Sequence, residues 1–162
     1  LHVIDLLTEI DIPTYVSCNA QQIDQIEKAT QIIPDEYQAI GPMGGILSAM
    51  RFNPKASWLV IACDLPLISS NTIEKLIANR KQDADVTTFQ LNDRFFETTF
   101  SIYEPSAFQL LDQFRTQENY RLQAVFSALS VQVLKADQLS EFLNVNTKAD
   151  LEQFEKMRSK QW

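Results

Sequence analysis

Along the chain, segments whose hydrophobic residues have helical spacing alternate with short strand-like segments. In segment 1–10 the apolar positions have helical spacing, and segment 14–18 is rich in β-branched and aromatic residues. The same exchange continues through the rest of the sequence. It predicts further helical segments at 21–28, 42–51, 69–80, 105–114, 122–129 and 147–157. It predicts further strands at 31–33, 57–63, 84–90, 95–103 and 131–134.

Strands that alternate with helices predict an α/β fold. Because parallel neighbours need crossover connections, we expect a three-layer arrangement with a mostly parallel twisted sheet and helices on both faces. Segments 84–90 and 95–103 flank an Asn92-Asp93 turn and should add one antiparallel pair. The nearly unbroken apolar run 57–63 is typical of a strand covered on both faces. A length of 162 residues with 45% hydrophobic content predicts a single domain, residues 1–162.

The charge balance narrows the classes of partner. The formal net charge is −7, and the sequence lacks the clustered Lys and Arg that nucleic acid or an anionic membrane would need, so we expect neither as a partner. No stretch reaches the roughly 20 apolar residues that span a bilayer. Cys18 and Cys63 end strand-like runs, which favours small buried residues in a reducing cytoplasm over a disulfide or a reactive thiol.

One carboxylate stands at the exit of the most apolar strand. In open α/β sheets, ligands bind outside the carboxyl ends of the strands. Asp64 follows run 57–63 directly, and Pro66 prevents that strand from continuing. Mg²⁺ commonly uses one or two protein carboxylates together with water and phosphate oxygens. Asp64 is therefore a candidate magnesium ligand, and the alternative is that it caps the turn.

Glycines accompany the start of the helix predicted at 42–51. Gly41, Gly44 and Gly45 place flexible backbone where free amides and a positive dipole end could face a base or a phosphate. The alternative is a helix entry whose glycines serve close packing.

Taken together, these motifs resemble those of the molybdenum cofactor guanylyltransferases of the MobA type, within the nucleotidyltransferase superfamily. They follow the order and approximate spacing of that family over nearly the whole chain. The matching segments are VSCNA at 16–20, PD at 34–35, GPMGGILSAM at 41–50, ACDLP at 62–66, FLNVNT at 142–147 and ADL at 149–151.

The resemblance implies a role for individual positions and a Rossmann-like nucleotidyltransferase fold. Asn19 and Asp35 would contact the guanine nucleotide, and Gly44 and Gly45 would shape the wall beside the base. Asp64 would be the catalytic residue that holds magnesium, the expected cofactor.

Further positions concern the metal and the acceptor. By analogy with the superfamily, Asn146 would be the second metal ligand. Glu97, Arg121 and Asn144 are the candidates for pterin contact, and ordinary surface, turn or structural residues are the alternative. In the strand near Glu97, Thr98 stands where relatives often have proline, and Arg121 begins an Arg-Leu-Gln where Ser-Leu-Arg is usual.

The implied reaction is attack of the molybdopterin phosphate on the α-phosphorus of GTP, with pyrophosphate leaving. GTP and molybdopterin are the expected partners, with a molybdoenzyme or another cofactor-biosynthesis protein as a further one. The alternatives are a CTP-dependent cytidylyltransferase for the same cofactor and a non-catalytic homologue that binds a nucleotide or a protein. The family opens with a strand and a glycine-rich loop with a lysine, absent here. We therefore expect the domain to be incomplete at its N-terminus, with its first strand missing, and inactive as this segment alone.

Overall fold

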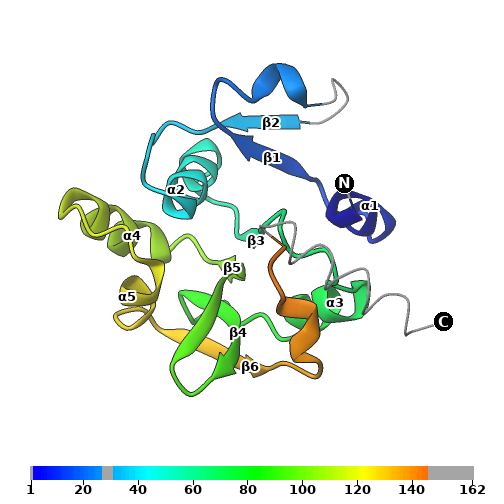
Figure 1. The fold of residues 1–162 in the computed structure, drawn as a ribbon. Coiled ribbons are helices and arrows are strands. Elements are labelled where there is room, and N and C mark those ends of the chain that lie inside the picture. The colour runs from blue at the N-terminus through cyan, green and yellow to red at the C-terminus, as the bar shows by residue number, and fades with distance from the viewer. Residues whose placement is uncertain (1, 27–30, 146–162) are drawn as a thin grey trace.

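The computed structural model describes residues 2–26 and 31–145, whose arrangement Figure 1 shows. The predicted order of elements is confirmed there, except that the described part of the helix expected at 21–28 holds only a short 3-10 helix. The helix expected at 147–157 lies outside the described residues. The α-helices are α1 (His2–Glu9), α2 (Pro42–Phe52), α3 (Ser70–Ala78), α4 (Ala107–Thr116) and α5 (Leu122–Phe126). Short 3-10 helices are η1 (Ile23–Gln25) and η2 (Leu139–Phe142). The strands are β1 (Tyr15–Cys18), β2 (Gln31–Pro34), β3 (Trp58–Ile61), β4 (Val86–Asn92), β5 (Phe95–Tyr103) and β6 (Val131–Lys135).

The strands of the described residues form two sheets. β1 and β2 make a parallel pair, and the second sheet has the order β3-β5-β4-β6. β5 runs antiparallel to both β3 and β4, whereas β4 and β6 are parallel. The α/β class and the predicted β4–β5 hairpin are therefore confirmed, but the pairing is more evenly mixed than the mostly parallel sheet we expected. The reason is that the returning arm of the hairpin, β5, inserts between β3 and β4.

Helices cover both faces of the four-stranded sheet (Figure 1). α2, α4 and α5 bury a core that includes Tyr103 of β5 on one face. α1, α3 and η2 bury a second core that includes Ile102 on the other face. Successive side chains of a strand point to opposite faces, so β5 supplies both cores. This is the three-layer arrangement that the sequence predicts.

β3 is less covered than its apolar sequence predicts. Every residue from Trp58 to Ile61 is half-buried, because β3 lies at one end of the sheet that the described strands form, with β5 as its hydrogen-bonded neighbour. Of the two cysteines, Cys18 is buried as expected, but Cys63 just beyond β3 is exposed, so the expectation of two buried cysteines is wrong for Cys63. Both thiols are free.

An aromatic cluster connects the two sheets. Tyr15 of β1 packs against Trp58 of β3 with ring centroids 5.6 Å apart, and Phe52 of α2 completes the cluster. Backbone hydrogen bonds do not join the sheets in the described part of the chain, and the first strand expected upstream stays a prediction. None of the helices in the described ranges combines the length and the apolar character that a membrane crossing requires.

Candidate functional site

The β1 and β2 exits bring two of the predicted nucleotide-binding residues together. The parallel register pairs Cys18 with Pro34, so Asn19 and Asp35 leave the sheet at the same edge. The amide of Asp35 donates to the carbonyl of Cys18 at 2.8 Å. Burial, and then the nearby carboxylate of Asp35, raise the pKa of the Cys18 thiol. Asn19 is exposed, and its Oδ1 accepts the amides of Gln21 and Gln22 at 3.0 and 3.1 Å, which closes the turn after β1.

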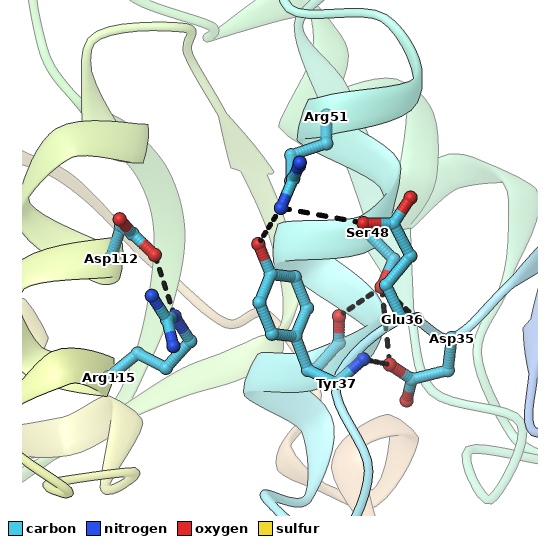
Figure 2. Close-up of polar contacts among 8 residues, drawn as sticks. Asp35, Glu36, Tyr37, Ser48, Arg51, Asp112 and Arg115 are labelled. Atoms are coloured by element: carbon cyan, nitrogen blue, oxygen red, sulfur yellow. Dashed lines mark hydrogen bonds and ion pairs between the residues drawn. The ribbon is translucent and has the colours of Figure 1, made fainter.

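Asp35 orders the loop between β2 and α2, as Figure 2 shows. Its Oδ1 accepts the amide of Tyr37 at 2.9 Å and lies 3.2 Å from the Ser48 hydroxyl oxygen. That hydroxyl also lies 2.8 Å from the Gly44 carbonyl oxygen and accepts the amide of Glu36 at 2.9 Å. Sequence reasoning missed Ser48, although its position four residues after Gly44 on the same helix face was a usable signal. All these Asp35 side-chain contacts involve Oδ1, and a base contact by Asp35 stays a prediction.

The two glycines at the start of α2 allow this loop to approach the helix. A Cβ atom on Gly44 would lie 2.6 Å from the Tyr37 carbonyl oxygen and 2.9 Å from both carboxylate oxygens of Asp35. A Cβ atom on Gly45 would lie 2.8 Å from the Ser17 hydroxyl oxygen. Close packing, the alternative reading of these glycines, is therefore confirmed, and their place beside a nucleotide base stays a prediction.

Asp64 has a buried side-chain oxygen without a hydrogen-bond partner among the described residues. The residue is half-buried, and its Oδ1 is fully buried without a hydrogen-bond partner there. A buried acceptor without a partner costs about 1–3 kcal/mol, and more when it is charged. Oδ1 makes no hydrogen bond that would cap the turn. The position instead suits a proton donor or a cation.

The segment after η2 lies against Asp64. The amide of Val145 donates to the Asp64 carbonyl at 3.0 Å, which carries the chain past the exit of β3. Asn144, a predicted pterin contact, is exposed on this segment. The next residue along, Asn146, the predicted second metal ligand, lies outside the described residues.

Glu97 of β5 is a second carboxylate beside Asp64. Burial, assisted by the negative charge of Asp64, raises the pKa of Glu97 even though Thr99 hydrogen-bonds to its carboxylate. Oε1 accepts the amide of Thr99 at 3.3 Å and its hydroxyl at 2.8 Å. Sequence reasoning missed Thr99, although residues two apart share one face of a strand. Arg121, by contrast, is exposed at the N-cap of α5.

Around Asp64 and Glu97 the described residues hold no group of three or more His, Cys, Asp or Glu side chains suited to a metal ion. A transition-metal cage is therefore not built from those residue types in this part of the chain. Mg²⁺ differs, because it keeps several waters and needs only one or two carboxylates. The free Oδ1 of Asp64 fits that donor set.

A separate cleft of about 490 Å³ lies between α2 and α4. The Tyr37 hydroxyl accepts Nη1 of Arg51 at 2.9 Å, and the Arg115 guanidinium lies 5.1 Å from the Tyr37 ring centroid (Figure 2). Asp112 holds Arg115 through a 2.6 Å contact. None of the residues predicted to form the site lines this cleft.

The sequence of this chain is similar to a family model and to several known proteins. The family model described as the MobA-like NTP transferase domain matches residues 1–133. A bifunctional molybdenum cofactor biosynthesis protein of Synechocystis sp. is 33% identical over 92% of this chain and 44% of its own length. A molybdenum cofactor guanylyltransferase of Vibrio atlanticus is 23% identical over 94% of this chain and 79% of its own length. The chain thus spans less than half of the Synechocystis relative.

A solved structure shares the fold. Molybdopterin-guanine dinucleotide biosynthesis protein A of Archaeoglobus fulgidus superposes with a TM-score of 0.79, at 23% identity, over 98% of this chain and 86% of its own.

Proposed function

The chain belongs to the family of MobA-like NTP transferase domains, and from that premise we propose that it forms the nucleotide-transferring part of a magnesium-dependent guanylyltransferase. The substrates would be GTP and molybdopterin, as the names of the relatives suggest. The observation that carries the proposal is the Oδ1 of Asp64 at the exit of β3, which has no partner among the described residues. A carboxylate left without a partner at a strand exit is suited to a cation that accompanies a nucleoside triphosphate.

Asp64 would hold the metal, with Asn146 as its expected partner. Bound Mg²⁺ supplies positive charge that offsets the negative charge of the phosphate oxygens during transfer. The chain's own part is to fix the carboxylate, and the hydrogen bond from Val145 to the Asp64 carbonyl anchors that turn. Little acid–base work is needed, because the attacking molybdopterin phosphate is already anionic. Catalysis then depends on orientation and charge stabilisation.

The β2–α2 loop would read the nucleotide base. Asn19 and Asp35 leave the sheet at one edge, and Gly44 and Gly45 let the loop lie close to α2. The hydrogen bonds of Asn19 and Asp35 order this edge before any ligand arrives, which lowers the entropy cost of binding.

The same proposal includes a cytoplasmic location and delivery of the product to a molybdoenzyme. It includes no binding of nucleic acid or membrane.

Nucleotide binding by the natural protein tests the proposal. Fluorescent GTP and CTP analogues are titrated in the presence of Mg²⁺, and formation of the pterin dinucleotide is followed with purified molybdopterin. We expect GTP to bind more tightly and to yield the guanine dinucleotide. Preference for CTP would replace the function with that of a cytidylyltransferase. Nucleotide binding without dinucleotide formation, or failure of both nucleotides to bind, would contradict the proposal and favour a non-catalytic homologue.

A further inference from the structure

Glu97 lies where the exit of β3 meets β5. The antiparallel register pairs Ile61 with Phe100, and the amide of Ala62 donates to the Thr99 carbonyl at 2.8 Å. Because the two segments run in opposite directions, continuation of this path brings Asp64 toward Glu97. The influence of the Asp64 charge on Glu97 agrees with that placement.

The backbone of β5 is shaped at Glu97 by buried hydroxyl groups. Thr88 donates its hydroxyl to the Glu97 carbonyl at 2.8 Å, and the Ser101 hydroxyl oxygen lies 2.6 Å from the same carbonyl oxygen. Thr88 and Ser101 are both fully buried, and the β4–β5 register shifts between Thr88 and Gln90. Buried hydroxyls are costly unless they are bonded, and here they bond to a carbonyl beside an irregularity in the strand pair.

The Glu97 side chain is oriented as well. Its Oε1 accepts both the amide and the hydroxyl of Thr99, which fixes the direction of the carboxylate. Two carboxylates placed close together in a partly buried site repel each other. A divalent cation between them would reverse that repulsion, and it would also provide the partner that Asp64 Oδ1 lacks within 2–26 and 31–145.

We propose that Glu97 supplies a second carboxylate oxygen to the divalent cation held by Asp64, and that Thr99 is the positioning residue that directs it. This inference rests on the proposed function, which places a cation at Asp64. It differs from the pterin contact expected of Glu97, because it assigns the carboxylate to the metal rather than to the acceptor. Two protein carboxylates are within the usual complement of a magnesium site.

The test is a titration of Mn²⁺, a paramagnetic substitute for Mg²⁺, into the full-length protein, with free Mn²⁺ followed by electron paramagnetic resonance. Glu97→Gln keeps the size of the side chain and an oxygen acceptor for Thr99, but it removes the charge. We expect it to weaken Mn²⁺ binding by about tenfold or more. Thr99→Val removes one of the two orienting donors and should weaken binding less, by about two- to tenfold, the worth of one hydrogen bond. Exposed Glu74→Gln on α3 is the matched control and should bind like the wild type.

Each result has a distinct meaning. Wild-type Mn²⁺ affinity in Glu97→Gln, with loss of binding in Asp64→Asn, would overturn the inference and leave the proposed function intact. If that same Glu97 variant instead showed a raised KM for molybdopterin, the residue would be an acceptor contact. Unchanged binding in both variants would remove the metal site from the proposed function itself. Circular dichroism checks that each variant is folded, and Glu97→Asp, which keeps the charge but shortens the side chain, should bind with intermediate affinity if Glu97→Gln does not fold.

Discussion

The two ends of the β3–β5 strand pair differ in whether their carboxylates have hydrogen-bond partners. At one end, Glu104 is 4% exposed and receives Nε and Nη2 of Arg80 at 2.6 and 2.9 Å and the Ser57 hydroxyl at 2.6 Å. At the other end, Asp64 has a buried oxygen without a partner in the described part of the chain, and its negative charge acts on Glu97. A buried carboxylate whose hydrogen bonds are satisfied joins neighbouring elements of the fold. A buried carboxylate oxygen without a hydrogen bond is free to bind a ligand or a cation.

The pKa values reflect the same contrast. Burial alone would raise the pKa of Glu104, but the hydrogen bonds from Arg80 and Ser57 and the charge of Arg80 outweigh it and lower the pKa. For Glu97, burial dominates and the Asp64 charge adds to it, so its pKa is raised. The protein's own side chains thus stabilise the ionised form of Glu104 more than burial opposes it. They do not do so for Glu97.

Removing the Asp64 charge should break the functional end with the largest effect. In the natural protein, Asp64→Asn should lower magnesium-dependent dinucleotide formation on the order of a thousandfold, because charge stabilisation in the transition state is lost. Stability should not fall, since Oδ1 makes no hydrogen bond among the described residues. Turnover and urea unfolding are measured on the same preparation. Activity close to that of the wild type would place the metal elsewhere.

Removing Glu104 should break the structural end instead. Glu104→Ala leaves the Arg80 guanidinium without its carboxylate partner, and we expect a loss of about 1–3 kcal/mol in the free energy of unfolding. The affinity for GTP should stay within a factor of about two at a temperature where the variant is folded. Urea unfolding and nucleotide titration check the two halves. A large loss of GTP affinity with unchanged stability would reverse the assignment of the two ends.

The pH dependence of stability sharpens the comparison. A carboxylate whose folded-state pKa is lowered contributes stability above its ordinary pKa, and that contribution is lost as pH falls through the folded-state value. The stability difference between wild type and Glu104→Gln should therefore be largest near neutral pH and shrink in acid. Unfolding curves collected from neutral to acidic pH measure it. A difference that grows as the pH falls would contradict the pairing of Glu104 with Arg80.

A smaller contrast lies at the start of α2, where Gly44 faces backbone that cannot easily move and Gly45 faces a side chain that can. Gly44→Ala would place Cβ against the Tyr37 carbonyl oxygen, a clash of about 1–3 kcal/mol that outweighs the helix propensity of alanine. Gly45→Ala meets the hydroxyl of Ser17, a side chain that can rotate, and should be milder. Thermal unfolding of the two variants compares them directly. Equal stability would show that the β2–α2 loop yields easily at both positions.

Much of the fold and part of the site could be predicted from local sequence. Asp64 was identifiable because its signal is contiguous, an apolar run followed by Asp and a nearby Pro. The sheet order was not, because the place of β5 beside β3 is decided by contacts across long stretches of chain. The same holds for Glu104, whose partner Ser57 is 47 residues away. No periodicity reports such a pair.

The acceptor side shows the limit of resemblance. Glu97 lies beside Asp64 and Asn144 follows on the segment that Asp64 anchors, whereas Arg121 is exposed at the N-cap of α5. Gln123, in the Arg-Leu-Gln that departs from the family pattern, instead holds β5 by hydrogen bonds to both the amide and the carbonyl of Phe96. The roles of Arg121 and Asn144 toward the pterin stay predictions, because a role in binding depends on the ligand's path and not on the type of residue.

The melting temperature of the natural protein with and without MgCl₂, at saturating GTP, shows whether Asp64 holds a magnesium ion. A ligand that binds only the folded state raises its stability with the logarithm of one plus the ratio of the free ligand concentration to the Kd. We predict that magnesium raises the melting temperature of the wild type by several degrees and that Asp64→Asn abolishes this rise. A magnesium-dependent rise of the same size in Asp64→Asn would contradict the account.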